Sequence, residues 1–135
     1  MRTLAIWAAT VSVAFAALAG VTTATRNTQQ VFVVVDGSFF MEDVATRIPT
    51  ELERIDDRTY TEFALATVSD QTNDSIHGYR ADLDWNDPTL FGPCSFDGLE
   101  DYPEASSADE RILITSVGSC DTSGLDGWTI VELDR

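Results

Sequence analysis

The sequence predicts a small α/β domain, a three-layer sandwich with a mainly parallel central sheet. Residues 31–35 form a continuous apolar run that is β-branched at all but one position, as in a strand buried on both faces. After this run, apolar residues recur every three or four positions, which is typical of an amphipathic helix. Strand and helix patterns continue to alternate with short connections, and this order favours a parallel sheet between helices.

The N-terminus predicts export of the chain. Residues 1–19 combine a positively charged start, an apolar run and a small-x-small pattern at 17–19, and these features indicate a signal peptide. A polar tether over 20–30 and the domain at 31–135 follow. An uncleaved membrane anchor at residues 4–21 is the alternative, because this stretch is almost long enough to span a bilayer. Both interpretations place the domain outside the cytoplasm, secreted or periplasmic.

A helix is expected directly after the first strand. Its apolar residues would form one stripe along the helix, while acidic residues lie mostly off the stripe. Pro49 interrupts the pattern, so we expect a kink or a break there. The residues of the stripe are Met41, Val44, Ala45, Ile48, Leu52 and Ile55.

The rest of the chain predicts four further strands and a short helix. The helices are too few to cover both faces of the sheet well, so one face is expected to be thinly covered. In chain order the expected elements are strands at Tyr60–Val68 and Ser75–Leu83, a loop at Asp84–Ser95, a short imperfect helix at Leu99–Ala108, and strands at Arg111–Val117 and Trp128–Leu133.

The composition excludes several classes of function. The 135 residues carry 23 acidic residues against 8 basic ones, a formal net charge of −15, and such a surface repels nucleic acid and anionic lipid. There is no lysine, so a Walker-type phosphate loop and a Schiff base are excluded. With one histidine, His77, and two cysteines, the common zinc sites cannot be completed. These exclusions favour a non-enzymatic domain.

Asp36, Gly37 and Ser38 follow the first strand. A carboxylate and a hydroxyl at the carboxyl end of a buried strand lie where open α/β sheets place their ligand sites. The same two side chains could instead cap the following helix by accepting hydrogen bonds from amides of its first turn. The sequence leaves both roles open.

The order of motifs resembles the von Willebrand factor type A domain over Val31–Gly118. The motifs are VFVVVD followed by Gly-Ser, an amphipathic helix, YTEFALATVSD, and RILITS ending in Ser-x-Gly. The resemblance implies a doubly wound α/β domain whose upper edge holds a metal-ion-dependent adhesion site. In that family, Asp-x-Ser-x-Ser, a loop threonine and Thr-Asp-Gly supply oxygens to a magnesium-type ion, and an acidic group of a partner protein completes the coordination.

This sequence keeps only part of that site. Asp36 and Ser38 match the first two positions, and Ser95 stands for the loop threonine. Phe40 replaces the second serine and Val117 the aspartate, so oxygens are missing. If an ion is held at all, Asp36, Ser38 and Ser95 are the ligands that the resemblance leaves, with Mg²⁺ or Ca²⁺ as the ion. We therefore expect a degenerate site without a bound cofactor.

The resemblance also implies a disulfide and a binding surface. The middle loop and the loop after the fourth strand are neighbours in that family, which would bring Cys94 and Cys120 together beside the former metal site, and export would allow them to oxidise. The implied function is binding or assembly with an unidentified protein partner, and not with nucleic acid. The expected binding residues are Asp36, Ser38, Phe39, Phe40 and Ser95.

A metal-dependent nuclease is the alternative function. VVVDGSFF also resembles the strand end of the NYN branch of PIN-like nucleases. In that interpretation Asp36 and Asp121, with Asp97 as a third candidate, would hold magnesium for phosphodiester hydrolysis. The acidic charge argues against this alternative, because a nuclease needs basic residues that bind phosphates.

Overall fold

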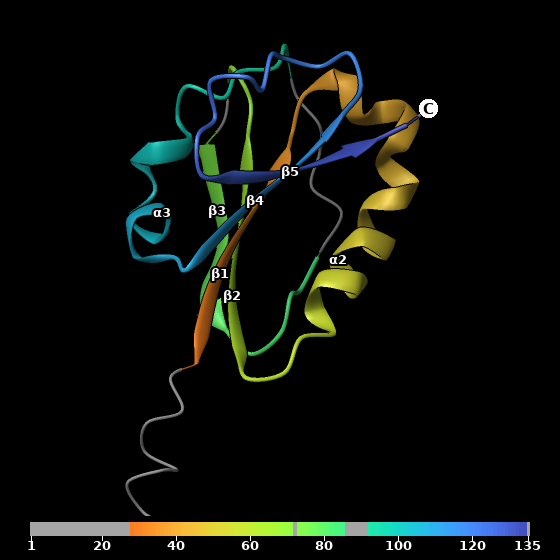
Figure 1. The fold of residues 1–135 in the computed structure, drawn as a ribbon. Coiled ribbons are helices and arrows are strands. Elements are labelled where there is room, and N and C mark those ends of the chain that lie inside the picture. The colour runs from red at the N-terminus through yellow and green to blue at the C-terminus, as the bar shows by residue number, and fades with distance from the viewer. Residues whose placement is uncertain (1–27, 72, 86–91, 135) are drawn as a thin grey trace, which may run out of the picture.

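A five-stranded sheet organises the chain, and helices lie on both of its faces (Figure 1). The computed structural model describes residues 28–71, 73–85 and 92–134, so the expected signal peptide and most of the tether lie outside the described residues. The strands are β1 (Gln29–Asp36), β2 (Thr61–Val68), β3 (Asn73–Arg80), β4 (Glu110–Ser116) and β5 (Trp128–Leu133). No helix among the described residues is long and apolar enough to span a bilayer.

The sheet has the strand order β3-β2-β1-β4-β5, with β1 in the centre. Strand β1 pairs in parallel with β2 and with β4, and β4 pairs in parallel with β5. Only the edge strand β3 runs antiparallel to its neighbour. The mainly parallel α/β fold predicted from the sequence is therefore confirmed.

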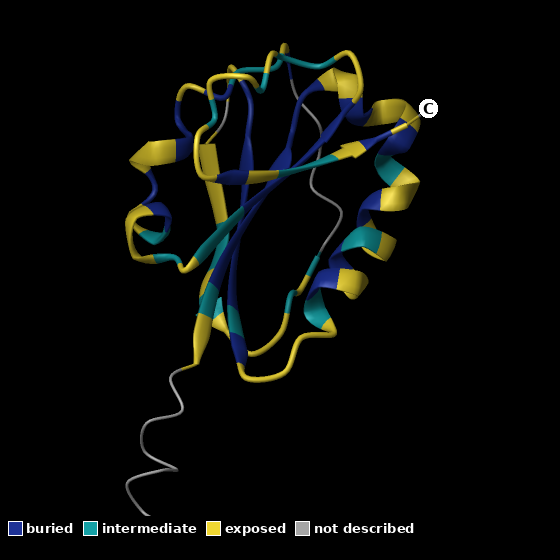
Figure 2. Ribbon diagram, in the orientation of Figure 1, coloured by how far each residue is buried: buried dark blue, intermediate teal, exposed yellow. Residues whose placement is uncertain are grey.

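Strand β1 lies in the centre because its residues suit burial on both faces. Every residue from Val31 to Asp36 is buried, and Val33 pairs with Leu65 on one side and Ile112 on the other. Neighbouring strands on both sides give the main-chain amides and carbonyls hydrogen-bond partners, so the strand does not need polar surroundings. Figure 2 shows this buried centre in dark blue.

The first helical segment covers one face of the sheet in two parts. A 3₁₀ helix, η1 (Phe39–Arg47), leads into the α-helix α2 (Ile48–Asp56), so the interruption expected at Pro49 is observed. Pro49 lies in the first turn of α2, where a missing amide hydrogen costs nothing. The predicted apolar stripe packs on the strands through Met41, Val44, Ile48, Leu52 and Ile55.

The opposite face is thinly covered, as expected. A short 3₁₀ turn, η2 (Leu99–Asp101), and the five-residue helix α3 (Pro103–Ser107) take the place of one predicted helix. The break falls at Tyr102, which is extended because a proline follows it. The core of this face is aromatic, with the ring of Phe32 5.4 Å from that of Tyr102 and 6.0 Å from that of Trp128.

The expected strand Ser75–Leu83 is shifted toward the N-terminus. Strand β3 begins at Asn73, which pairs with Val68 directly after the turn, and it ends at Arg80. Leu83 follows the strand and packs partly buried against the core. Main-chain pairing, rather than apolar content, sets the limits of this exposed edge strand. A prediction from the periodicity of apolar residues therefore placed the strand too far toward the C-terminus.

Candidate functional site

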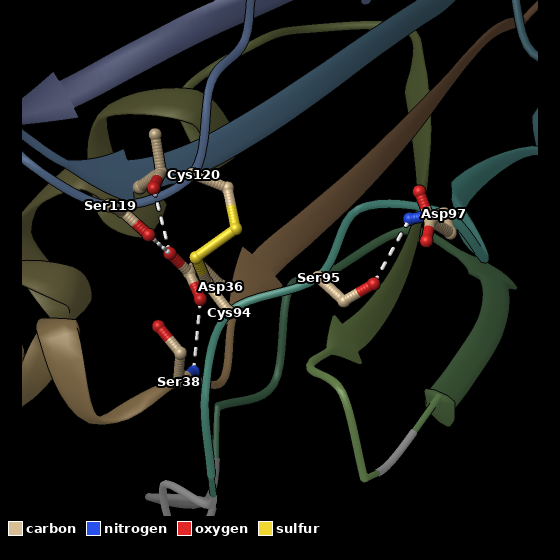
Figure 3. The surroundings of a disulfide bond; sticks show 8 residues. Asp36, Ser38, Cys94, Ser95, Asp97, Ser119 and Cys120 are labelled. Atoms are coloured by element: carbon tan, nitrogen blue, oxygen red, sulfur yellow. Dashed lines mark hydrogen bonds between the residues drawn. A yellow bond between two sulfur atoms is a disulfide. The ribbon is translucent and has the colours of Figure 1, made fainter.

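The carboxyl ends of β1 and β4 meet at one edge of the sheet, because the two strands are parallel neighbours. Asp36 is the last residue of β1, and Thr115 and Ser116 end β4. The loop after β4 then passes over this edge and brings Ser119 and Cys120 to it (Figure 3). The position expected for a ligand site is therefore occupied by polar side chains from two strands and one loop.

Asp36 is a fully buried carboxylate with three hydrogen-bond donors. Its Oδ2 accepts from the hydroxyl of Thr115 at 2.7 Å and from that of Ser119 at 2.6 Å. Its Oδ1 accepts from the amide of Ser38 at 2.9 Å. Bonds to an ionised acceptor are about twice as strong as neutral ones, so these donors can offset the cost of burying the carboxylate.

Thr115 and Ser119 are the site residues that sequence reasoning missed. They lie 79 and 83 residues from Asp36 in the chain, and the resemblance directed attention to Ser116 and Val117 instead. The run of hydroxyl residues at the end of a buried strand was the available signal, since carboxyl ends of parallel strands converge. Ser116 itself donates to the carbonyl of Phe40 at 2.9 Å and not to Asp36.

The capping role considered for Asp36 and Ser38 is wrong. Ser38 is the N-cap residue of η1, but its side chain makes no capping hydrogen bond. The amide of Phe39 donates to the carbonyl of Gly92 at 3.0 Å instead. The Ser38 hydroxyl is buried and has no hydrogen-bond partner among the described residues, and Asp36 accepts from the Ser38 amide rather than from the first turn.

The other positions of the adhesion motif do not add ligands beside Asp36. Ser95 points toward Asp97 in Figure 3, and its hydroxyl accepts from the Asp97 amide at 3.4 Å. Phe40 and Val117 are exposed hydrocarbon side chains. Mg²⁺ and Ca²⁺ take about six or more oxygens. Beside the Asp36 carboxylate, the described residues of this edge offer the hydroxyls of Ser38, Thr115 and Ser119, and the last two donate to that carboxylate. One carboxylate and three hydroxyls leave part of such a coordination shell unsupplied.

The acidic residues of the nuclease alternative are not gathered around one point. Among the described residues no group of three or more histidine, cysteine or acidic side chains could hold a metal ion. Asp97 and Asp121 line a hollow of about 380 Å³ beside the disulfide, and Asp36 is not part of its lining. The amide and then the hydroxyl of Ser123 bind the Asp121 carboxylate and lower its pKa.

Cys94 and Cys120 form a disulfide, with Cα atoms 5.8 Å apart. The bond joins the loop that precedes η2 to the loop that follows β4, and Cys120 directly follows Ser119. Figure 3 shows the sulfurs beside Asp36 and its donors. The disulfide therefore fixes the loop that supplies a donor to Asp36.

An apolar hollow opens on the same side of the molecule. Phe39 is 55% exposed and Phe40 is 41% exposed, although both follow a buried strand directly. Together with Gly92 and Pro93 they line a hollow of about 400 Å³. Two neighbouring exposed phenylalanines are unusual on a surface as acidic as this one, and they mark the hollow as a candidate contact surface.

No family model and no curated protein matches this sequence. A solved structure described as the crystal structure of the SpRpn10 VWA domain is similar to it, with a TM-score of 0.49 and 13% sequence identity over 78% of this chain and 88% of that chain. The fold is similar to that of a von Willebrand factor type A domain. At this identity the similarity concerns the fold alone and says nothing about ligands or partners.

Proposed function

We propose that this chain is a secreted or periplasmic, non-enzymatic domain that binds a protein partner or takes part in assembly, and that its adhesion-type metal site is degenerate. The observation that carries the proposal is the state of Asp36. Its two oxygens are held by a main-chain amide and two hydroxyls of the chain itself, which leaves this carboxylate a structural role. The apolar surface beside it remains available for contact.

Two features support a location outside the cytoplasm. The first is the export pattern of residues 1–19. The second is the Cys94–Cys120 bond, since disulfides persist mainly in oxidising compartments.

A degenerate site is supported by the hydrogen bonds and the disulfide that join the loops at this edge. In a metal-dependent site, the cation would draw the loops at this edge together through their oxygens. Here the hydroxyl of Ser119 binds Asp36 directly, and the next residue, Cys120, is joined covalently to Cys94. Hydrogen bonds and a disulfide thus perform the joining of loops that an ion would otherwise provide.

The proposed contact surface consists of Phe39, Phe40 and Ser95 at the edge above Asp36 and Ser38. Exposed aromatic side chains contribute much of the binding energy in protein interfaces, because they bury a large apolar area with little loss of side-chain entropy. Asp36 and Ser38 are buried. The Asp36 carboxylate accepts from the Ser38 amide, so it holds the start of η1 in place and does not touch a partner.

Site-specific photocrosslinking tests the contact surface. A benzophenone amino acid is placed at Phe39 or Phe40 in the full chain, and at Tyr60 as the matched control. Tyr60 is an aromatic residue with 68% exposure that immediately precedes β2, at the opposite end of the strands. In the extracytoplasmic fraction of cells that make the protein, we expect discrete protein adducts from positions 39 and 40 and none from 60. Equal yields at all three positions, or no adduct at 39 and 40, would contradict the proposal.

Calorimetric titration with Mg²⁺ and Ca²⁺ tests the degenerate metal site. We expect no stoichiometric heat of binding from the oxidised protein, and no hydrolysis of DNA or RNA when Mg²⁺ or Mn²⁺ is added. A saturable one-to-one site that Asp36→Asn removes would refute the degenerate site. Hydrolysis of nucleic acid that the same substitution abolishes would refute the non-enzymatic function.

A further inference from the structure

The asparagines of this chain differ in the residue that stands two positions later. Of the three asparagines, only Asn73 is followed at that position by a hydroxyl residue, which is Ser75, and Asp74 lies between them. An asparagine, any residue except proline, and then a serine or threonine form the acceptor motif for N-linked glycans of secreted proteins. The motif requires a surface position, so its place in the fold decides whether it can be used.

Asn73 and Ser75 lie on the surface, at the beginning of the edge strand β3. The first three residues of β3 are exposed, and none of its 8 residues is buried (Figure 2). Asn73 pairs with Val68 and Ser75 with Ala66, and no register shift separates these pairs. Because side chains alternate along a strand, those of Asn73 and Ser75 leave the sheet on the same face. The two side chains that define the motif are therefore exposed side by side.

The carboxamide of Asn73 lies against Gly98, which directly precedes η2. A Cβ atom added at Gly98 would lie 1.9 Å from Nδ2 of Asn73, so a larger residue there would displace the carboxamide. Gly98 has a φ of −90°, which other residues adopt as well, so the glycine is favoured by space and not by conformation. Asn73 and Gly98 line a hollow of about 150 Å³ together with Asp101 and Tyr102. A sugar attached to Nδ2 would lie at this hollow.

The charge near the motif favours a neutral group over an anionic one. Asp74 belongs to the motif and Asp101 lines the hollow, in a chain with a net charge of −15. Arg80, at the other end of β3, and Arg111, on β4, are each paired with a carboxylate of another residue. A phosphate on Ser75 would be repelled by the neighbouring carboxylates, whereas sugar hydroxyls can donate hydrogen bonds to them. A bulky glycan would also shield the edge strand β3 from pairing with another chain.

We propose that Asn73 carries an N-linked glycan. Nδ2 of Asn73 forms a bond to C1 of the first sugar of a lipid-linked oligosaccharide phosphate, while the bond from C1 to the phosphate oxygen breaks. The electron pair of the broken bond leaves with the phosphate, and one proton of Nδ2 passes to a base of the transferring enzyme. The inference rests on the proposed location outside the cytoplasm, and it does not involve the surface formed by Phe39 and Phe40.

Mass spectrometry of the full-length protein, isolated from the cells that naturally make it, tests the proposal. Cleavage after arginine releases residues 59–80, a peptide in which Asn73 is the only asparagine. We expect this peptide to carry the added mass of an oligosaccharide, and fragmentation of the peptide to place that mass on Asn73. Cell fractionation, together with the oxidation state of Cys94 and Cys120, gives the location of the same sample.

Two results would overturn the inference in different ways. An unmodified Asn73 in an extracytoplasmic protein with an oxidised disulfide would refute the glycan and leave the proposed location intact. An unmodified protein recovered from the cytoplasm with free thiols would refute both the glycan and the proposed location.

Substitutions within the motif separate its two parts. Asn73→Gln keeps a carboxamide but removes the acceptor, and Ser75→Ala keeps Asn73 but removes the hydroxyl, so each should abolish the added mass. Ser75→Thr preserves the motif and should retain the glycan. Both positions are exposed, so all three variants should fold and form the disulfide as the wild type does. Sugar that persists in Asn73→Gln would be attached to a hydroxyl and would refute the inference.

Discussion

Removal of the Asp36 carboxylate should destabilise the domain strongly. Asp36 is fully buried, and three donors point at its oxygens over distances of 2.6 to 2.9 Å. A hydrogen bond to a charged group contributes about 1.5–3 kcal/mol, and an unsatisfied buried donor costs about 1–3 kcal/mol. Because the Thr115 and Ser119 hydroxyls can rotate toward other acceptors, the full sum is not reached. We expect Asp36→Ala to cost about 4 kcal/mol in the free energy of unfolding.

Two milder changes divide this effect. Asp36→Asn keeps the volume and one acceptor oxygen but loses the charge, and it should cost about 2 kcal/mol. Ser119→Ala removes one donor and should cost about 1.5 kcal/mol, since the other two bonds remain. Asp97→Ala is the matched control, because Asp97 is an exposed acidic residue near the same edge and should change stability by less than about 0.5 kcal/mol.

Urea denaturation followed by circular dichroism measures these differences in the free energy of unfolding, with the disulfide oxidised throughout. Equal m-values for all variants would show that they unfold to a common state. The sign of the change decides between two roles for Asp36. A structural anchor gives a loss of stability in the order Ala, Asn, Ser119→Ala. A carboxylate kept for a ligand would be a burden on the free protein, so unchanged or increased stability in Asp36→Asn would refute the structural role.

Three further predictions concern the same region and its supports. Replacing Cys94 and Cys120 with alanine should lower the free energy of unfolding by about 3.5 kcal/mol, the loop-entropy value for a separation of 26 residues. Denaturant titrations of the oxidised and the reduced wild-type protein should differ by the same amount. Ser38→Ala should leave the free energy of unfolding unchanged or raise it by up to about 1 kcal/mol, because the substitution removes a buried hydroxyl that has no partner among the described residues. A loss above about 1 kcal/mol would show that this hydroxyl has a partner. Burial raises the pKa of Tyr102 to about 12, above the value of about 10 in an unfolded chain. The neutral Tyr102 hydroxyl therefore contributes fully to the free energy of unfolding below about pH 10, and this contribution is lost as the pH rises through about 12. Thermal melts of Tyr102→Phe should lack this alkaline loss, and an identical pH dependence in the variant would contradict the assignment.

Local patterns were sufficient for most of the architecture. The apolar run of β1, the apolar stripe of η1 and α2, and the break near Pro49 were each predicted within a few residues. Burial on two faces, burial of one helix face and the missing proline amide each leave a pattern within a short window of sequence. Strand β3 was misplaced because its residues are mostly exposed and leave no such mark.

The sequence by itself determined an acidic α/β domain, with Asp36 at the end of its central strand and two cysteines in the two loops near it. Only the tertiary structure decided which side chains Asp36 meets, namely the hydroxyls of Thr115 and Ser119. The physical reason is separation along the chain. Periodicity reports which face of an element is buried. The hydrogen-bond partners of Asp36, in contrast, lie about eighty positions away in the sequence, and only folding brings them together.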